Sequence, residues 1–197
     1  MAQIGLYFQT TLDTKVSLLP EQINGDMDRY LLKNLKAKIE GKAIDSGIVI
    51  KINGLIGYNH GMIDKANFMG TTVYVVKYEC FICSPTANLE IICVINNFVK
   101  GFMLGSNGPV TVVVPFNNID LTKFENQGDQ IINKKTKTPI EKDNYVKVSV
   151  VNINNNLGEK KMVVLCKLVG VADEDDIRRY SQEQESIRDN DDNVEFI

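Results

Sequence analysis

The sequence contains no tryptophan and only one histidine, His60, among its 197 residues. It has no run of 18 apolar residues, so we expect no membrane-spanning helix. Its first ten residues lack a basic segment followed by an apolar one, so we expect no secretory signal. The four cysteines are unevenly spaced, unlike a disulfide scaffold. The composition, 44% hydrophobic and 24% charged, predicts a globular protein of one or two domains.

Charge is divided unequally along the chain. The net charge is −3, but residues 173–197 hold ten acidic and three basic side chains, so the remainder carries a net +4. A mildly basic body thus carries an acidic, flexible tail. We weigh three roles for the tail: an interaction segment, an intramolecular competitor for the basic surface, or a solubility element. The 20 asparagines and 21 isoleucines, with lysine favoured over arginine, are typical of an AT-rich genome, either a large DNA virus or an AT-rich microbe.

The first half of the chain predicts strands around one helix. Residues 11–19 alternate loosely and end at Pro20, which indicates a strand and a turn. Apolar residues then recur every four positions from Met27 to Ile39, which predicts an amphipathic helix ending at Gly41. Residues 44–52 are rich in β-branched side chains, which favours a strand, whereas residues 54–70, rich in glycine, suggest a long exposed loop with short extended pieces. Residues 71–83 give the clearest strand, and one face should carry Tyr74, Val76, Tyr78, Cys80 and Ile82.

The second half predicts a small β-barrel. We expect strands at residues 89–96, 99–104, 110–114, 145–153 and 161–169, with a turn at Asn96-Asn97. The polar residues 125–143 indicate an insertion or flexible loop, and a short helix followed by disorder should come after Ala172. Five short strands with a long connection after the third match a Greek-key barrel of the OB type.

The sequence offers no catalytic constellation. Cys80 and Cys83 form a CxxC pair, but a spacing of three in a strand places them on opposite faces, and Cys93, Cys166 and His60 are too scattered to complete a zinc site. We therefore interpret the cysteines as buried, reduced and structural. His60 is the only histidine available as a general base, and no phosphate-binding glycine loop or dinucleotide motif occurs. We predict no enzyme activity, no cofactor and no metal.

Lysines and phenylalanines in the barrel region predict weak binding of single-stranded nucleic acid. OB folds bind single strands with a basic groove and aromatic side chains that stack on bases. The alternative for each residue is an ordinary role, with phenylalanines filling the barrel and lysines in solvent. The candidates for RNA contact are Phe98, Lys100, Phe102, Lys123, Lys147, Lys160 and Lys161.

Taken in order, these segments resemble the stalk subunit of multi-subunit DNA-directed RNA polymerases, the family that includes the seventh subunit of eukaryotic RNA polymerase II and its archaeal counterpart. The resemblance covers about residues 6–172. It rests on residues 40–50 (EGKAIDSGIVI), on residues 70–85 (GTTVYVVKYECFICSP), which are similar to the family's long strand and junction proline, and on residues 88–115, which follow its first three OB strands.

The resemblance implies an α+β fold in three parts. Residues 1–83 would form a truncated ribonucleoprotein-like tip domain, residues 84–172 a five-stranded OB-fold RNA-binding barrel, and residues 173–197 an acidic, flexible tail. The tail beyond Tyr180 goes past the family's usual end. The tip would dock on the polymerase core near the clamp, the barrel would contact nascent RNA, and a second stalk subunit would bind both. The candidates for core docking are Gly57, His60, Met62, Ile63 and Phe68.

We therefore predict a non-catalytic polymerase subunit acting in transcription initiation and processivity, in a version from a large DNA virus. It would be intracellular with the transcription machinery, in host cytoplasm or nucleus, with packaging in the virion as a further option. Two alternatives remain open. One is a free-standing OB-fold RNA-binding protein, such as a translation or RNA-processing factor. The other is a viral scaffold or packaging protein that binds through its tail.

Overall fold

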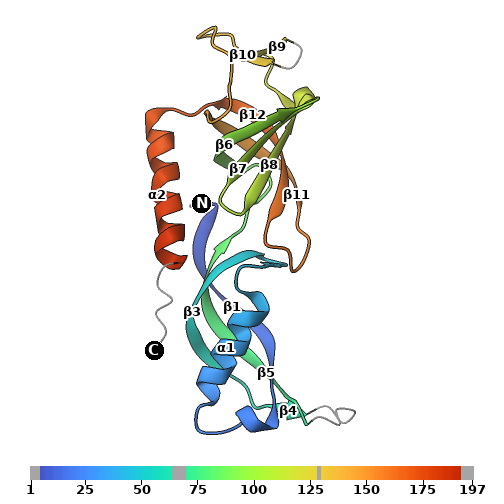
Figure 1. Ribbon diagram of the computed structural model, residues 1–197, viewed down its shortest axis with the longest axis vertical. Helices are drawn as coiled ribbons and strands as arrows, with labels where there is room; N and C mark the ends of the chain where they lie inside the picture. The colour runs from blue at the N-terminus through green and yellow to red at the C-terminus, as the bar shows by residue number, and fades with distance from the viewer. Residues whose placement is uncertain (1–4, 64–69, 128–129, 192–197) are drawn as a thin grey trace.

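The protein is α+β and mostly β, with two stacked parts along its longest axis (Figure 1). The structure is a computed structural model that describes residues 5–63, 70–127 and 130–191. An antiparallel sheet with one helix on it lies at one end, a closed barrel lies at the other, and a second long helix runs beside the barrel and the start of the sheet.

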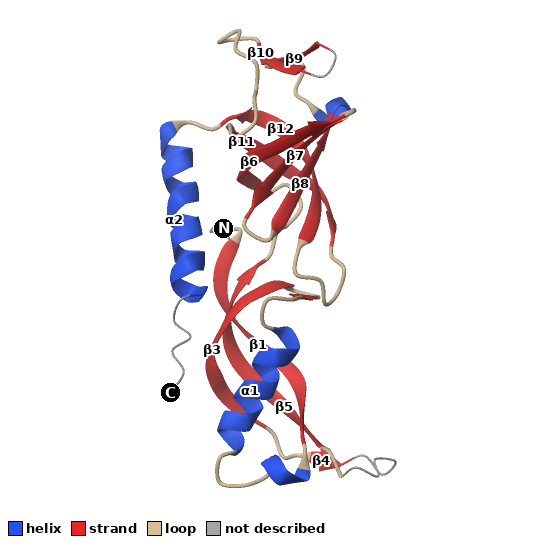
Figure 2. Cartoon of the chain, in the orientation of Figure 1, coloured by secondary structure: helices blue, strands red, loops and turns tan. Residues whose placement is uncertain are grey.

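The N-terminal sheet has the strand order β1-β5-β3-β2, with β4 pairing β5. Helix α1 covers one face of this sheet (Figure 2) and buries Leu31, Leu35 and Ile39 against it, which confirms the predicted amphipathic helix. The strand predicted to end at Pro20 is also confirmed. The elements are β1 (Tyr7–Leu18), α1 (Met27–Ile39), β2 (Ala43–Ile44), β3 (Gly47–Tyr58), β4 (Met62–Ile63) and β5 (Thr72–Cys83).

The alternation predicted for β5 is confirmed. Tyr74, Val76, Tyr78, Cys80 and Ile82 are all buried in the core beneath α1. By contrast, the loop expected at residues 54–70 was wrong in its first part, because β3 continues to Tyr58. The two-residue strand β4 is one of the short extended pieces expected there. Three register shifts interrupt the pairing of β3 with β5. Each shift resets which face a residue points to, so the period-two pattern that marks a strand disappears from the sequence.

The C-terminal strands close into a barrel of order β11-β12-β8-β7-β6, with β6 also pairing β11. All neighbours are antiparallel except β8 and β12, which are parallel. This order agrees with an OB-like barrel, as the strand pattern predicted. Inward-facing apolar residues of all five strands fill it. The strands are β6 (Glu90–Val99), β7 (Phe102–Asn107), β8 (Val110–Pro115), β11 (Tyr145–Asn154) and β12 (Met162–Val171).

Two details of the barrel differ from the sequence prediction. The turn expected at Asn96-Asn97 is wrong: β6 passes through these residues with a bulge and turns at Gly101, whose φ of +84° suits glycine. Residues 125–143 are not simply an irregular loop, because β9 (Phe124–Gln127) and β10 (Gln130–Asn133) form a hairpin. Phe124 and Ile131 are buried in the barrel core and anchor this hairpin, although its composition is polar.

The expected short helix of the tail is helix α2 (Glu174–Asp191), 18 residues long. The helix is longer than expected, and residues 192–197 lie outside the described residues. Helix α2 has few apolar side chains from which its packing could be predicted. Polar contacts to the rest of the chain, described below, hold it. Within the described residues, no helix is long and apolar enough to cross a membrane.

Candidate interaction surfaces

Exposed apolar side chains gather at the end of the N-terminal sheet farthest from the barrel. Strand β4 pairs there with the start of β5, and the short 3-10 helix η1 (Pro20–Gln22) follows β1 at the same end (Figure 1). Met62 and Ile63 are 59% and 62% exposed. We call this group the apolar end, and its members are Leu19, Ile23, Tyr58, Met62 and Ile63.

The structure brings together part of the predicted docking set. Met62 and Ile63 form β4, and the exposed His60 lies in the connection just before it. Gly57 is in β3 opposite Lys77, not in a loop. Phe68 lies outside the described residues. Leu19, Ile23 and Tyr58 were not among the predicted docking residues, because only the folded sheet brings these separate segments to one end.

The two phenylalanine candidates have different environments. Phe98 is half-buried and packs against the barrel core, so its ring is largely used by the fold. Phe102 is 43% exposed and pairs with Val99 and Pro115 across β6 and β8. Lys100 is exposed in the turn between β6 and β7. A ring and a charge at one turn are able to stack on a base and pair with a phosphate.

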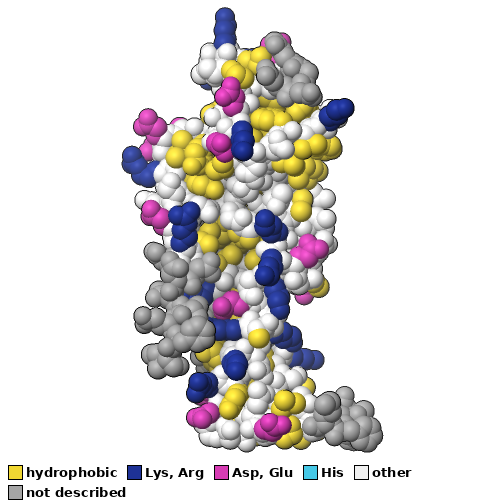
Figure 3. All heavy atoms as spheres, viewed as in Figure 1, with side chains coloured by type: hydrophobic (Ala, Val, Ile, Leu, Met, Phe, Trp, Pro, Cys, Tyr) yellow, Lys and Arg dark blue, Asp and Glu magenta, His cyan; other side chains and the backbone are white. Residues whose placement is uncertain are grey.

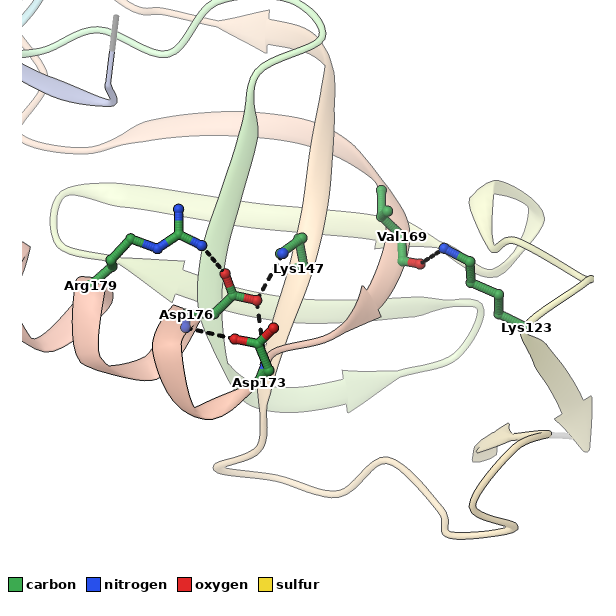
Figure 4. Close-up of polar contacts among 6 residues, drawn as sticks. All are labelled: Lys123, Lys147, Val169, Asp173, Asp176 and Arg179. Atoms are coloured by element: carbon green, nitrogen blue, oxygen red, sulfur yellow. Dashed lines mark hydrogen bonds and ion pairs between the residues drawn. The ribbon is translucent and has the colours of Figure 1, made fainter. Parts of the chain in front are cut away.

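The lysine candidates are not one group. Lys147 pairs with Asp176 at 2.8 Å (Figure 4), and Lys123 donates to the Val169 carbonyl at 3.0 Å. Both ammonium groups therefore serve contacts within the protein. Lys160 and Lys161 are exposed at the end of the β11–β12 loop. The sequence held no sign that Lys147 would pair with the tail.

Asp176 anchors the start of α2 to the barrel. Its carboxylate is 1% exposed and accepts from Lys147 and Arg179, and its backbone N–H donates to the Asp173 carboxylate at 2.8 Å (Figure 4). Burial alone would raise the pKa of Asp176, but the hydrogen bonds from Lys147 and the Asp173 backbone, with the charges of Lys147 and Arg179, lower it below its usual value. The carboxylate is thus ionised at neutral pH.

The far half of α2 is held by the side chain of Gln184, which bonds the buried Asn107. Gln184 Nε2 and the Tyr7 hydroxyl both donate to Asn107 Oδ1 at 2.9 Å, and Asn107 Nδ2 donates to the Ile92 carbonyl at 2.8 Å. Asn107 is fully buried. Since Tyr7 belongs to β1 and Asn107 to β7, this network joins α2, the N-terminal sheet and the barrel.

The four cysteines are buried and free. As predicted, Cys80 and Cys83 point to opposite faces: Cys80 lies in the core under α1, and Cys83 lies in the core that includes the barrel. Burial raises the pKa of Cys80 to about 11 and that of Cys83 to about 12. Among the described residues, no three histidine, cysteine or carboxylate side chains gather as metal ligands.

The fold and these surfaces define a two-part α+β protein with an OB-like barrel at one end and exposed apolar side chains at the other. No protein-family model matches the chain. The chain is, however, 51% identical over 199 aligned positions to a protein of Acanthamoeba polyphaga mimivirus, with both chains covered completely. That protein's name assigns it provisionally as a DNA-directed RNA polymerase subunit.

The chain therefore belongs to this family of DNA-directed RNA polymerase subunits of large DNA viruses. The prediction of a viral RNA polymerase subunit is confirmed.

Proposed function

We propose that the protein is a non-catalytic stalk subunit of a viral RNA polymerase. The apolar end docks on the large subunits near the clamp, and the barrel projects outward and contacts nascent single-stranded RNA. The observation that carries this proposal is the position of the apolar end, at the extremity of the sheet opposite the barrel (Figure 1). One end can therefore be bound while the other remains free.

The chemistry of the apolar end suits a protein partner. Its five members are large apolar or aromatic side chains, each at least 40% exposed. The buried centre of a protein–protein interface is depleted in charge and rich in such side chains. Belonging to a polymerase-subunit family supports the polymerase core as the occupant.

The domain division is part of the same proposal. Residues 1–83 would act as the docking domain and residues 84–172 as the RNA-binding domain. Two buried clusters support this division, one between α1 and the sheet and one in the barrel. Leu6, Ala43, Ile48 and Cys83 join the barrel cluster, so the two parts share a packed junction. The partners would include a second stalk subunit, and the protein would act in initiation with the transcription machinery of the infected cell, with packaging in the virion as its route into the next host.

The test compares two substitutions at equally exposed apolar residues. Ile63 is 62% exposed in the apolar end, and Leu121 is 65% exposed beyond the barrel. Tagged full-length protein is expressed with the large polymerase subunits and recovered by its tag. Ile63→Asp should lower recovery of the large subunits at least tenfold, because it buries a charge in the interface, while Leu121→Asp should leave recovery unchanged.

Equal recovery with both variants would refute docking through the apolar end. If the wild-type protein bound RNA but recovered no polymerase, the alternative of a free-standing RNA-binding protein would replace the proposal.

A further inference from the structure

Lysine side chains form a row that crosses from the barrel onto α1. In the middle and lower parts of the face drawn in Figure 3, Lys and Arg side chains predominate over acidic ones, whereas in the upper part the two kinds are interspersed. Lys33, Lys160 and Lys161 are exposed, and Lys36 and Lys42 are half-buried. We call the following set the basic stripe: Lys33, Lys36, Lys42, Lys160 and Lys161.

Backbone contacts make the stripe continuous across the junction. The Ala43 N–H donates to the Glu159 carbonyl at 2.8 Å, and the Gly158 N–H donates to the Ala43 carbonyl at 2.9 Å. Because Lys42 precedes Ala43 and Lys160 follows Glu159, these contacts bring the two lysines together. The β11–β12 loop and the end of α1 thus present one positive surface.

Neighbouring acidic groups only partly offset this charge. The Glu40 carboxylate turns inward and accepts from the Ile52 N–H at 3.1 Å. Glu159 accepts from the Asn156 amide at 3.2 Å, and Asp45 is exposed. Five lysines facing three carboxylates, one of them turned inward, leave a net positive surface.

The outer wall of the barrel offers little to a phosphate. Side chains facing outward from β7 and β8 are uncharged, and Lys167 is the charged residue among those of β12. The charge of Lys147 is already paired with the buried Asp176 carboxylate. The barrel thus offers single lysines, such as Lys100 in the β6–β7 turn, whereas the stripe offers several in sequence. The outward side chains of β7 and β8 are Phe102, Leu104, Ser106, Thr111, Val113 and Pro115.

We propose that the basic stripe binds the phosphate backbone of single-stranded RNA and leads the strand from the barrel loop along α1. This inference rests on the proposed function and extends it, since it carries the RNA contact from the barrel domain onto α1 of the docking domain. Lysine neutralises phosphate without reading bases, so binding is tolerant of sequence and weakens as salt rises.

The size of the effect follows from counterion release. Each phosphate contact on a single strand contributes about 0.7 to the slope of log affinity against log salt. Removing two contacts should lower that slope by about 1.4, which is about 25-fold in affinity at 0.1 M salt if the affinities converge at 1 M.

The experiment measures binding of the purified full-length protein to labelled 20-nucleotide oligouridine over a salt series. Two variants each remove two stripe charges, Lys160→Gln/Lys161→Gln in the loop and Lys33→Gln/Lys36→Gln on α1. The matched control, Lys135→Gln/Lys137→Gln, removes two exposed charges beyond the β9–β10 hairpin. Lys42 is left intact because its ammonium bonds the Ala37 and Lys38 carbonyls at the end of α1.

We expect both stripe variants to weaken binding about 25-fold at 0.1 M salt with a reduced slope, and the control to bind as the wild type does. If the control loses affinity while the stripe variants keep theirs, the stripe assignment is overturned and RNA contact by the subunit stands. If the wild type binds no RNA at low salt, RNA contact itself is overturned, together with the stripe.

Discussion

The start of α2 is attached to the barrel by one buried carboxylate, and its removal should loosen this part of the helix. Asp176 accepts from Lys147 at 2.8 Å, and that lysine side chain is only 28% exposed. Arg179 also contacts the carboxylate but is 67% exposed, so its contribution is largely screened by solvent. The Lys147 contact therefore dominates, and hydrogen bonds to charged groups are worth roughly 1.5–3 kcal/mol.

Asp176→Asn keeps the shape of the side chain and removes its charge. We expect it to cost about 2 kcal/mol in the docking of α2, which is about 30-fold in the opening equilibrium. Amide hydrogen exchange reports this opening, so the amides in the first half of α2 should exchange about 30-fold faster, while barrel amides keep their rates.

The control is Asp175→Asn in the same first turn. Asp175 is 85% exposed, and its Oδ1 lies 3.9 Å from Arg178 Nη1. The Asp175→Asn substitution therefore removes the same charge from the helix N-terminus without breaking a buried pair. The exchange rates of the α2 amides in this variant should stay within about twofold of those in the wild type. Equal acceleration by both variants would refute the reasoning, because it would trace the effect to the helix terminus rather than to the buried pair.

The pH dependence has a definite sign. The folded pKa of Asp176 is lowered, so its contribution is present above the ordinary carboxyl value, about 3.9, and is lost as pH falls through the folded value. The difference between wild type and Asp176→Asn should thus persist at pH 7 and shrink below about pH 4. A difference that grows on acidification would contradict this assignment.

Three further predictions concern the junction and the core. Asn107→Ala should lower the free energy of unfolding by about 2–4 kcal/mol in denaturant titrations, because it leaves buried hydrogen-bonding groups without their partner; a loss below about 0.5 kcal/mol would contradict it. Gly108→Ala should lower the melting temperature more than Gly101→Ala: both glycines have positive φ, but a Cβ at Gly108 would lie 2.5 Å from the Tyr7 hydroxyl, whereas none of the described atoms lies within 4 Å at Gly101. The four buried thiols should resist a thiol-specific reagent at pH 8 and react together after unfolding; rapid reaction in the native state would show that they are accessible.

Much of the fold was predictable because regular alternation is local. The buried positions of α1 repeat every four residues and those of β5 every two, and both are visible without knowing the partner element. Where the pairing shifts register, as in β3 and β6, the pattern breaks and the boundaries were predicted wrongly.

The surfaces were less predictable because they join distant segments. Lys147 was predicted as an RNA contact from its charge, yet it pairs with Asp176 in the tail. Lys160 and Lys161 were predicted, but their continuity with Lys42 depends on backbone contacts between β2 and the β11–β12 loop. The charge of a lysine suggests that it binds phosphate, but the groups packed around it decide whether its ammonium is free to do so.

The most direct test of the stalk assignment is lysine crosslinking of the polymerase purified from infected cells through a tag on this chain. Lys77 lies in the N-terminal sheet opposite Gly57, and Lys135 and Lys137 lie beyond the barrel. We expect a stoichiometric subunit whose crosslinks to the large subunits come from Lys77 and not from Lys135 or Lys137. Crosslinks confined to Lys135 and Lys137, or absence of the chain from the purified polymerase, would contradict it.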